Sequence, residues 1–274
     1  MHHGYYPEGK PRKDHAQAQV DMIDRSLEWA GVDVGLQDSA EKGTSSSSSS
    51  PPVRRVLDVG CGIGGSSRHI ARKYGCAARG ITLSPVQAAR ANALTREAGI
   101  PDVSFQVGDA LRQPFDDGEF DLVWSMESGE HMPDKTKFVG ELARVCAPGG
   151  RVLIVTWCHR VLRDGETTLP PDEQFLLDRI CDAYYLPAWC SVEDYAAIAE
   201  NAGLVDVKTE DWSKEVSPFW RAVIDTALTV EGITGLLKAG PTTIRGGLVM
   251  PLMQQGLRSG TIKFNLITAR KPAA

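Results

Sequence analysis

The amino-acid sequence predicts an α/β protein with a seven-stranded, mostly parallel sheet and helices on both faces of that sheet. Two observations support this prediction. Between residues 55 and 157, short apolar stretches alternate with segments in which apolar residues have helical spacing. The first apolar stretch, residues 56–59, runs directly into a turn rich in glycine. Alternation of strands and helices is typical of a parallel sheet covered by helices on both faces.

The part of the chain before this first strand divides into three segments. Residues 1–7 are rich in turn formers, and we expect His2 and His3 to belong to a solvated tail, because adjacent side chains diverge and make a poor metal site. Residues 11–30 have apolar side chains at helical spacing, which predicts an amphipathic helix packed on a larger body. Residues 37–52 contain six consecutive serines and then two prolines, which predicts a low-complexity linker.

The rest of the chain supplies the elements of the sheet in order. We expect strands over residues 56–59, 77–82, 103–107, 120–125, 151–157, 204–212 and 261–270, and helices over residues 85–98, 135–146, 175–185 and 191–201. Ser191 is expected to cap the last of these helices. Residues 213–260 are too long and too apolar for a hairpin loop. The predicted domains are residues 1–36, the linker 37–52, and residues 53–274 with the insertion 213–260.

The composition argues against several classes of function. The chain has 30 basic and 35 acidic side chains and a net charge of −5, which argues against nucleic-acid binding as its main task. Its six cysteines contain no C-x-x-C pair, so we expect neither a metal site nor a redox pair. No apolar stretch approaches the 18 residues that span a bilayer, and the acidic residues near the start argue against a transit peptide in this segment.

The glycine turn predicts a site for a nucleotide-like ligand. Gly60, Gly62 and Gly65 match the fingerprint of dinucleotide-binding proteins. Asp58, Gly60, Gly62 and Gly64 also match D-x-G-x-G-x-G, the loop of S-adenosylmethionine methyltransferases. Glycine lets a ligand approach the bare backbone, and the helix after the turn offers unpaired N–H groups. In the second interpretation, the Asp58 carboxylate meets the ammonium group of the methionine.

Further motifs favour methyl transfer over hydride transfer. Asp109, within Gly108-Asp109-Ala110, follows the third strand, where a carboxylate can accept a hydrogen bond from the adenine amino group. Residues 120–124 mark the fourth strand, and residues 148–150 precede the fifth. Thr82 ends the second strand, where both kinds of protein usually have a carboxylate that binds the ribose, and a hydroxyl binds it more weakly. A nicotinamide-dependent dehydrogenase is therefore disfavoured.

A dense cluster of titratable residues follows the fourth strand. Glu127, Glu130 and His131 lie where a base could reach an acceptor beside the cofactor. We expect at least one of the three to orient the cofactor or to cap the next helix instead. His159, which follows the fifth strand, is a rival base.

Several segments resemble the γ-tocopherol methyltransferases of plants and algae. The similarity covers almost the whole chain and includes residues 1–6, 56–85, 124–135, 154–160 and 185–191. Residues 80–87 also resemble the corresponding loop of sterol and cyclopropane-forming methyltransferases, in which the threonine, leucine and glutamine touch the cofactor. The resemblance implies a Rossmann-like class I methyltransferase with a helical substrate cap and S-adenosyl-L-methionine as cofactor. We therefore expect cofactor-binding roles for Asp58, Gly60, Cys61, Gly62, Gly64, Thr82, Leu83, Gln87, Asp109, Ala110 and Ser125, and catalytic roles for His131, Glu130 and Glu127.

The activity that the resemblance implies is methylation of a ring carbon next to the phenol of γ-tocopherol and δ-tocopherol in the plastid. Our hypothesis is that His131, supported by Glu130, takes the phenol proton. The partner is then a small hydrophobic phenol and not a nucleic acid, and the sequence predicts no oligomeric state. Residues 213–260 are expected to wall an apolar pocket for the prenyl-derived tail, together with Trp157, Tyr184, Tyr185 and Trp189. For Lys238, Arg245, Arg258 and Lys263 we expect a solvated face in preference to contact with the plastid membrane.

Two other functions stay open on the sequence. Alkaloid N-methyltransferases share this pattern, so an indole amine is an alternative acceptor. Family members also have a further segment before the His-His-Gly stretch, and it resembles a lid over the cofactor. The chain could therefore be a truncated form, or a cofactor-binding regulatory protein without turnover.

Overall fold

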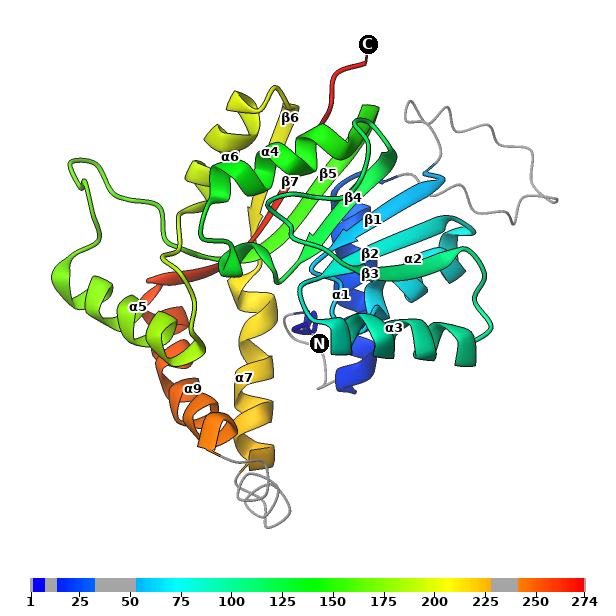
Figure 1. The fold of residues 1–274 in the computed structure, drawn as a ribbon. Helices are drawn as coiled ribbons and strands as arrows, with labels where there is room; N and C mark the ends of the chain where they lie inside the picture. Colours follow the sequence, from blue (N-terminus) through cyan, green and yellow to red (C-terminus); the bar gives the residue numbers. More distant parts are fainter. Residues whose placement is uncertain (1, 8–13, 33–52, 228–240, 274) are drawn as a thin grey trace.

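The computed structural model describes residues 2–7, 14–32, 53–227 and 241–273. The strands are β1 Arg55–Val59, β2 Ala77–Thr82, β3 Val103–Val107, β4 Phe120–Met126, β5 Cys146–His159, β6 Val205–Asp211 and β7 Ile262–Arg270. They form one sheet in the order β3-β2-β1-β4-β5-β7-β6 (Figure 1). Strands β1 to β5 are parallel to one another, whereas β7 lies antiparallel between β5 and β6. The predicted α/β class and the mostly parallel sheet are confirmed.

Helices cover both faces of this sheet. They are α1 His15–Trp29, α2 Gly65–Tyr74, α3 Pro85–Glu97, α4 Lys135–Val145, α5 Pro171–Tyr184, α6 Val192–Asn201, α7 Ser213–Ala227 and α9 Pro241–Ser259, with the 3-10 turn η1 Gly129–His131. Because successive strand side chains point to opposite faces, Leu57 and Val59 join the core under α4 and α6, and Val56 joins the core under α1 and α2. The amphipathic helix predicted over residues 11–30 is confirmed as α1, which buries Met22 and Leu27.

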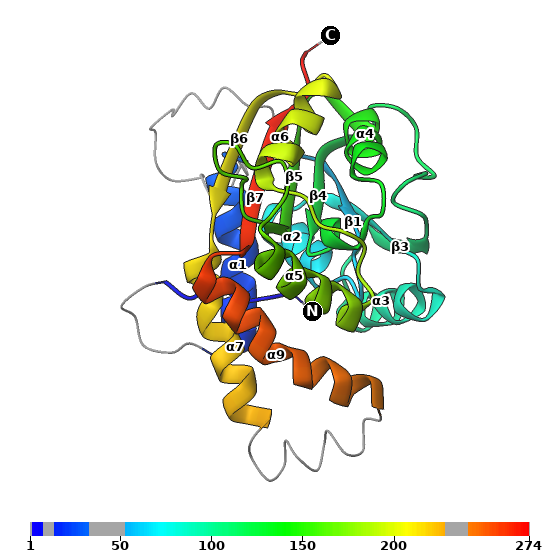
Figure 2. The ribbon, with the colours of Figure 1, turned by 90° about the vertical axis from the view of Figure 1, so that its left-hand side faces the viewer.

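A helical cap lies beyond the edge at which the parallel strands end. It consists of α5, α7 and α9, and α9 packs against both of the others (Figures 1 and 2). Helix α7 begins two residues after β6 ends, so the chain passes directly from the sheet into the cap. The insertion predicted at residues 213–260 is therefore largely helical where the structure describes it. Ligands of parallel α/β sheets bind at this edge, so the cap is placed to cover a site there.

Most predicted boundaries agree with the structure to within a few residues. Ser191 caps α6 as predicted, in a capping box with Asp194. The exception is residues 148–150, predicted to precede the fifth strand, because β5 already begins at Cys146, which pairs with Phe120 across an irregular register. The predicted linker, residues 37–52, lies outside the described residues. No described helix is both long enough and apolar enough to cross a membrane.

Candidate functional site

The glycine turn after β1 borders a cavity of about 460 Å³ at the carboxyl edge of the sheet. Gly60, Gly62 and Gly64 have φ angles of +85°, +54° and +76°, in the left-handed region that favours glycine. A Cβ at Gly60 would lie 2.3 Å from the Cβ of Ser128, and one at Gly64 would lie 2.2 Å from the ring of Phe105. The backbone is thus held close to its neighbours, and α2 begins directly after the turn.

The structure brings most of the sequence-predicted site residues to this one cavity. Its lining includes Asp58, Gly60, Cys61, Gly62, Thr82, Leu83, Gln87, Asp109, Ala110, Glu127 and His131. Gly64, Ser125 and Glu130 do not line it. Gly64 faces Phe105, and the Ser125 hydroxyl is 2.6 Å from that of Ser128, which in turn donates a hydrogen bond to the carbonyl of Val59.

Asp58 is the penultimate residue of β1, and its buried carboxylate is only 3 % exposed. One of its oxygens accepts a 2.5 Å hydrogen bond from the Ser67 hydroxyl on α2. Burial raises the pKa of Asp58 to about 6, and the bond from Ser67 opposes this rise only in part. A carboxylate held in this way lacks the counter-charge that an ammonium group would supply.

Polar residues at the carboxyl ends of β2 and β3 also line the cavity. The Thr82 hydroxyl donates a 2.7 Å hydrogen bond to the side-chain oxygen of Gln87, which fixes the two side chains together. Asp109 accepts a 2.9 Å hydrogen bond from the backbone N–H of Leu111 through one carboxylate oxygen. Because the strands lie in the order β3-β2-β1, Asp109 after β3 and Asp58 in β1 flank Thr82 in β2, an arrangement that fits an adenosyl group with an amino-acid tail.

Glu127, at the end of β4, is paired with the start of the chain. Its two oxygens accept hydrogen bonds of 2.5 Å from the backbone N–H of His3 and 2.7 Å from His3 Nδ1. Burial alone would raise the pKa of Glu127, but the charge and the hydrogen bonds of His3, with a contribution from His2, outweigh burial and lower it from the ordinary 4.5. Glu127 also has a φ of +50°, so its backbone is strained.

The prediction that the adjacent histidines form a solvated tail is wrong. His3 is only 9 % exposed, and its ring lies 4.3–6.0 Å from the rings of Trp157, Phe219, Trp220 and Phe264. His2 lines the cavity. No local pattern in the sequence could reveal this, because the partners of His3 lie more than a hundred residues away; the resemblance of residues 1–6 to the family was the one available signal.

His131 and Glu130 lie on η1 but differ in environment. His131 lines the cavity and is exposed, yet the protein around its ring and the charge of Lys135 lower its pKa below 6.5. Glu130 is 4 % exposed and accepts a 2.7 Å hydrogen bond from the Thr156 hydroxyl. Burial first, and then the negative charge of Glu127, raise the pKa of Glu130 to about 8. Glu130 is thus a neutral acid at pH 7.

Replacement of Glu130 by glutamine is expected to leave activity and stability at pH 7 close to those of the wild type. Because Glu130 ionises near 4.5 in the unfolded chain and near 8 in the folded protein, it lowers the stability of the wild type as the pH rises between these values, and Glu130→Gln lacks this contribution. Thermal unfolding from pH 4 to pH 9 measures this difference. Glu130→Leu is the comparison, since it leaves the Thr156 hydroxyl without its acceptor. Equal loss of activity in both variants would show that the ionised carboxylate is needed.

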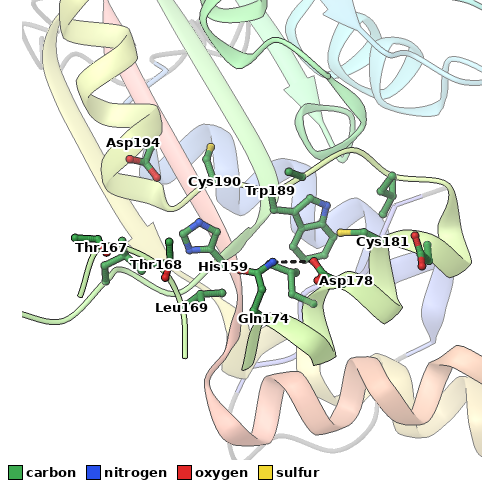
Figure 3. A pocket seen from close by; sticks show the side chains of 15 residues that line it. His159, Thr167, Thr168, Leu169, Gln174, Asp178, Cys181, Trp189, Cys190 and Asp194 are labelled. Carbon is green, nitrogen blue, oxygen red and sulfur yellow. Dashed lines mark hydrogen bonds between the residues drawn. The ribbon is translucent and has the colours of Figure 1, made fainter. Parts of the chain in front are cut away.

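A second, larger cavity of about 720 Å³ lies between the end of β5, α5 and the start of α6 (Figure 3). His159 lines this cavity and not the first, so the rival base stands apart from the glycine turn. Trp189 also lines it and stacks on Trp157 with ring centroids 6.4 Å apart. Tyr184 and Tyr185 line neither of these two cavities. The apolar tail pocket stays a prediction.

Two further kinds of site can be compared with the described residues, a metal site and a cationic surface for a membrane. No group of three or more His, Cys, Asp or Glu among them is arranged to hold a metal ion. Of the four cations considered for a membrane surface, Lys263 forms a 2.9 Å ion pair with Asp211. Lys238 and the side chain of Arg245 lie outside the described part of the chain.

The family comparison agrees with the cavity. Residues 57–154 match the family model described as a methyltransferase domain. The match spans the glycine turn, the strands β2 to β4 and most of the polar residues at the cavity. With the strand order of the sheet, it defines the chain as a class I methyltransferase that depends on S-adenosylmethionine.

Sequence identity to individual relatives identifies the family within this class of methyltransferases. The chain is 60 % identical to a rice (Oryza sativa subsp. japonica) protein named "Probable tocopherol O-methyltransferase, chloroplastic", over 99 % of this chain and 72 % of the relative. It is 54 % identical to the chloroplastic tocopherol O-methyltransferase of Arabidopsis thaliana, over 99 % of this chain and 76 % of that one. The chain belongs to the tocopherol O-methyltransferase family.

More distant proteins share the architecture. Norajmaline N-methyltransferase of Rauvolfia serpentina is 37 % identical over 99 % of this chain and 90 % of its own length. The crystal structure of geranyl diphosphate C-methyltransferase from Streptomyces coelicolor has a TM-score of 0.74 and 21 % identity, covering 99 % of this chain and 90 % of that one. The similarity to geranyl diphosphate C-methyltransferase shows a shared fold alone.

Proposed function

We propose that the protein methylates tocopherols in the plastid. The reaction joins the methyl group of S-adenosylmethionine to a ring carbon next to the phenol, and converts γ-tocopherol to α-tocopherol and δ-tocopherol to β-tocopherol. The observation that carries this proposal is the identity of 54–60 % to tocopherol O-methyltransferases over nearly the whole chain. The chloroplastic relatives support the plastid as its location.

The cofactor would occupy the cavity beside the glycine turn. When bound, it supplies an electrophilic methyl group on a sulfonium centre. The Asp58 carboxylate would bind the methionine ammonium, and the backbone of Gly60, Cys61 and Gly62 would lie against the cofactor without side chains in the way. Asp109, with Ala110 beside it, would accept a hydrogen bond from the adenine amino group.

Thr82 at the end of β2 and two residues after it would complete the cofactor site. Thr82 and Gln87, already hydrogen-bonded to each other, would bind the ribose, and Leu83, which is 73 % exposed, would cover the adenine. Gly64 and Ser125 would act indirectly, because Gly64 admits the ring of Phe105 and Ser125 holds Ser128 under the turn.

The acceptor would lie on the side of the cavity formed by β4 and η1. A free phenol has a pKa of about 10, so a base that takes its proton raises the electron density on the neighbouring carbon. His131 is neutral at pH 7 and lines the cavity, and we assign it this task. Glu130 would support η1 through Thr156, and Glu127 would hold His3, so neither carboxyl group would contact the phenol.

The test is an acceptor assay with isotopically labelled S-adenosylmethionine. The protein is incubated with γ-tocopherol, δ-tocopherol, a prenylated benzoquinol precursor or an indole amine, and products are identified by mass. Label in α-tocopherol is the expected result. Label in the amine alone would place the chain with the N-methyltransferases, to which it is less similar. Binding of S-adenosylhomocysteine without turnover of any acceptor would favour a regulatory role.

A further inference from the structure

Residues 2–7, which we call the N-terminal strap, contact helices α1 and α7 beside the site. Its Tyr5 N–H donates to the carbonyl of Ala18 on α1, and its Tyr6 N–H donates to the carbonyl of Glu215 on α7, both at 2.9 Å. Figure 1 shows this dark blue segment between α7 and α3. Gly4 packs so closely on α1 that a Cβ there would lie 2.5 Å from the Cβ of Ala18. The strap thus joins the cap to the sheet at the edge of the cavity.

His2 is fixed within this strap at both its backbone and its ring. Its carbonyl accepts a 2.6 Å hydrogen bond from the side-chain amide of Gln19. Its ring Nδ1 lies 2.9 Å from the carbonyl of His3, and the N–H and ring of His3 are bound to Glu127. The chain of contacts runs from the end of β4 through His3 to His2, so Glu127 and His3 are positioning residues for His2.

The contact of Nδ1 settles the tautomer of His2. A carbonyl oxygen can only accept, so Nδ1 carries the proton. Burial lowers the pKa of His2, against the attraction of Glu127, so the ring is neutral at pH 7 and its second nitrogen, Nε2, has a lone pair. Among the described residues, Nε2 of His2 has no hydrogen-bond partner, and His2 lines the cavity. His2, a residue of the cavity lining, thus carries a ring nitrogen without a proton on a side chain that is held in place.

Methylation of a phenol on carbon moves two protons, not one. The phenol O–H proton leaves as the ring carbon attacks, and a C–C bond forms while the C–S bond of the sulfonium breaks. The ring is then a neutral cyclohexadienone that still carries hydrogen on the methylated carbon. Loss of that C–H proton, with return of a proton to the oxygen, restores the aromatic ring and leaves one proton to release.

We infer that His2 is a second proton acceptor of the reaction, and that its Nε2 takes the proton from the methylated ring carbon. A phenol hydroxyl finds a base by hydrogen bonding, which suits the exposed His131. A C–H bond forms no such hydrogen bond, so the base that takes its proton must already be held in place, as His2 is. The C–H bond breaks, its electron pair returns to the ring, the Nε2–H bond forms, and His131 returns its proton to the oxygen. This inference rests on the proposed tocopherol methylation.

The test compares the same substitution at three histidines. In His2→Asn, the amide N–H can still donate to the His3 carbonyl, but no base remains. With γ-tocopherol deuterated at the ring position that receives the methyl group, this variant should lose about 100-fold in kcat and acquire a primary isotope effect that the wild type lacks. His131→Asn should lose rate without gaining this isotope effect. His159→Asn is the matched control, because its Nδ1 also contacts the next carbonyl, at 2.7 Å, and it lines the other cavity.

Two further measurements distinguish failure of the role of His2 from failure of the proposed function. Affinity for S-adenosylhomocysteine should stay within about twofold of the wild type in His2→Asn, since the cofactor residues are intact. Nitrogen NMR of the wild type without substrate should show that His2 is protonated on Nδ1 and unprotonated on Nε2 at pH 7. A proton on Nε2, or a His2→Asn variant with unchanged kcat and no isotope effect, would overturn the role of His2. A wild-type protein with this tautomer that methylates no tocopherol would overturn the proposed function instead.

Discussion

Asp58→Asn is expected to stabilise the protein without ligand and to destroy its affinity for the cofactor. Burial raises the pKa of Asp58 from 3.8 to about 6, so the folded state binds a proton more tightly than the unfolded chain does. Stability is therefore lost as the pH rises from 3.8 to 6, by at most about 3 kcal/mol at about 1.4 kcal/mol per pKa unit. Asparagine carries no charge to bury and can still accept the bond from Ser67.

Thermal unfolding of Asp58→Asn at pH 4 and at pH 7, with and without S-adenosylhomocysteine, measures both effects. The gain in stability without ligand should appear at pH 7 and vanish at pH 4. The loss of affinity should be about 2–5 kcal/mol, the usual cost of removing one partner of a buried charge pair. Asp109→Asn is the comparison, because it replaces another carboxylate that lines the same cavity. Wild-type affinity in Asp58→Asn would refute the role of this carboxylate.

Gly60→Ala is expected to unfold or severely destabilise the glycine turn. The left-handed backbone costs a non-glycine residue about 1–2 kcal/mol. In addition, the new Cβ would lie 2.3 Å from Ser128, a residue held by hydrogen bonds to Ser125 and Val59, so Ser128 cannot give way freely. The loss of stability should exceed the backbone cost, and the variant should also lose binding of S-adenosylhomocysteine.

Two other glycines of the same turn provide matched controls. A Cβ at Gly62 meets no atom within 4 Å, so the stability of Gly62→Ala without ligand should fall by the backbone cost alone. Gly65 has neither a positive φ nor a neighbour within 4 Å and begins α2, so Gly65→Ala should be neutral or slightly stabilising. Urea unfolding and calorimetric binding report the three variants. If Gly60→Ala and Gly62→Ala behave alike, the contact with Ser128 is unimportant.

The sheet could be predicted from the sequence because its signals are local. The β2 and β3 strands lie at the predicted residues, since glycine, proline and charged residues interrupt the apolar stretches on either side. The glycine turn and Asp58 could likewise be assigned to one site, because a strand that enters a turn and a helix has few alternative geometries. Eleven of the fourteen residues predicted for the site line one cavity.

The missed features depend on contacts between distant segments. His3 is 124 positions away from Glu127, and no periodicity or composition links the two. Glu130 and His131 are adjacent in sequence, yet the tight turn of η1 sends one into the core beside Thr156 and leaves the other at the cavity. The resemblance of residues 1–6 to the family could show that this segment matters, but not which group it contacts.

The antiparallel strand β7 has a consequence for the order in which the protein is made. Residues 262–270 pair with β5 on one side and with β6 on the other, so the last of the described strands to be synthesised is an interior strand of the sheet. Until it emerges, β5 has an open edge and β6 has no neighbouring strand. The strands that carry the cofactor cavity, β1 to β4, do not pair with β7, whereas the antiparallel edge of the sheet is complete only when β7 is in place.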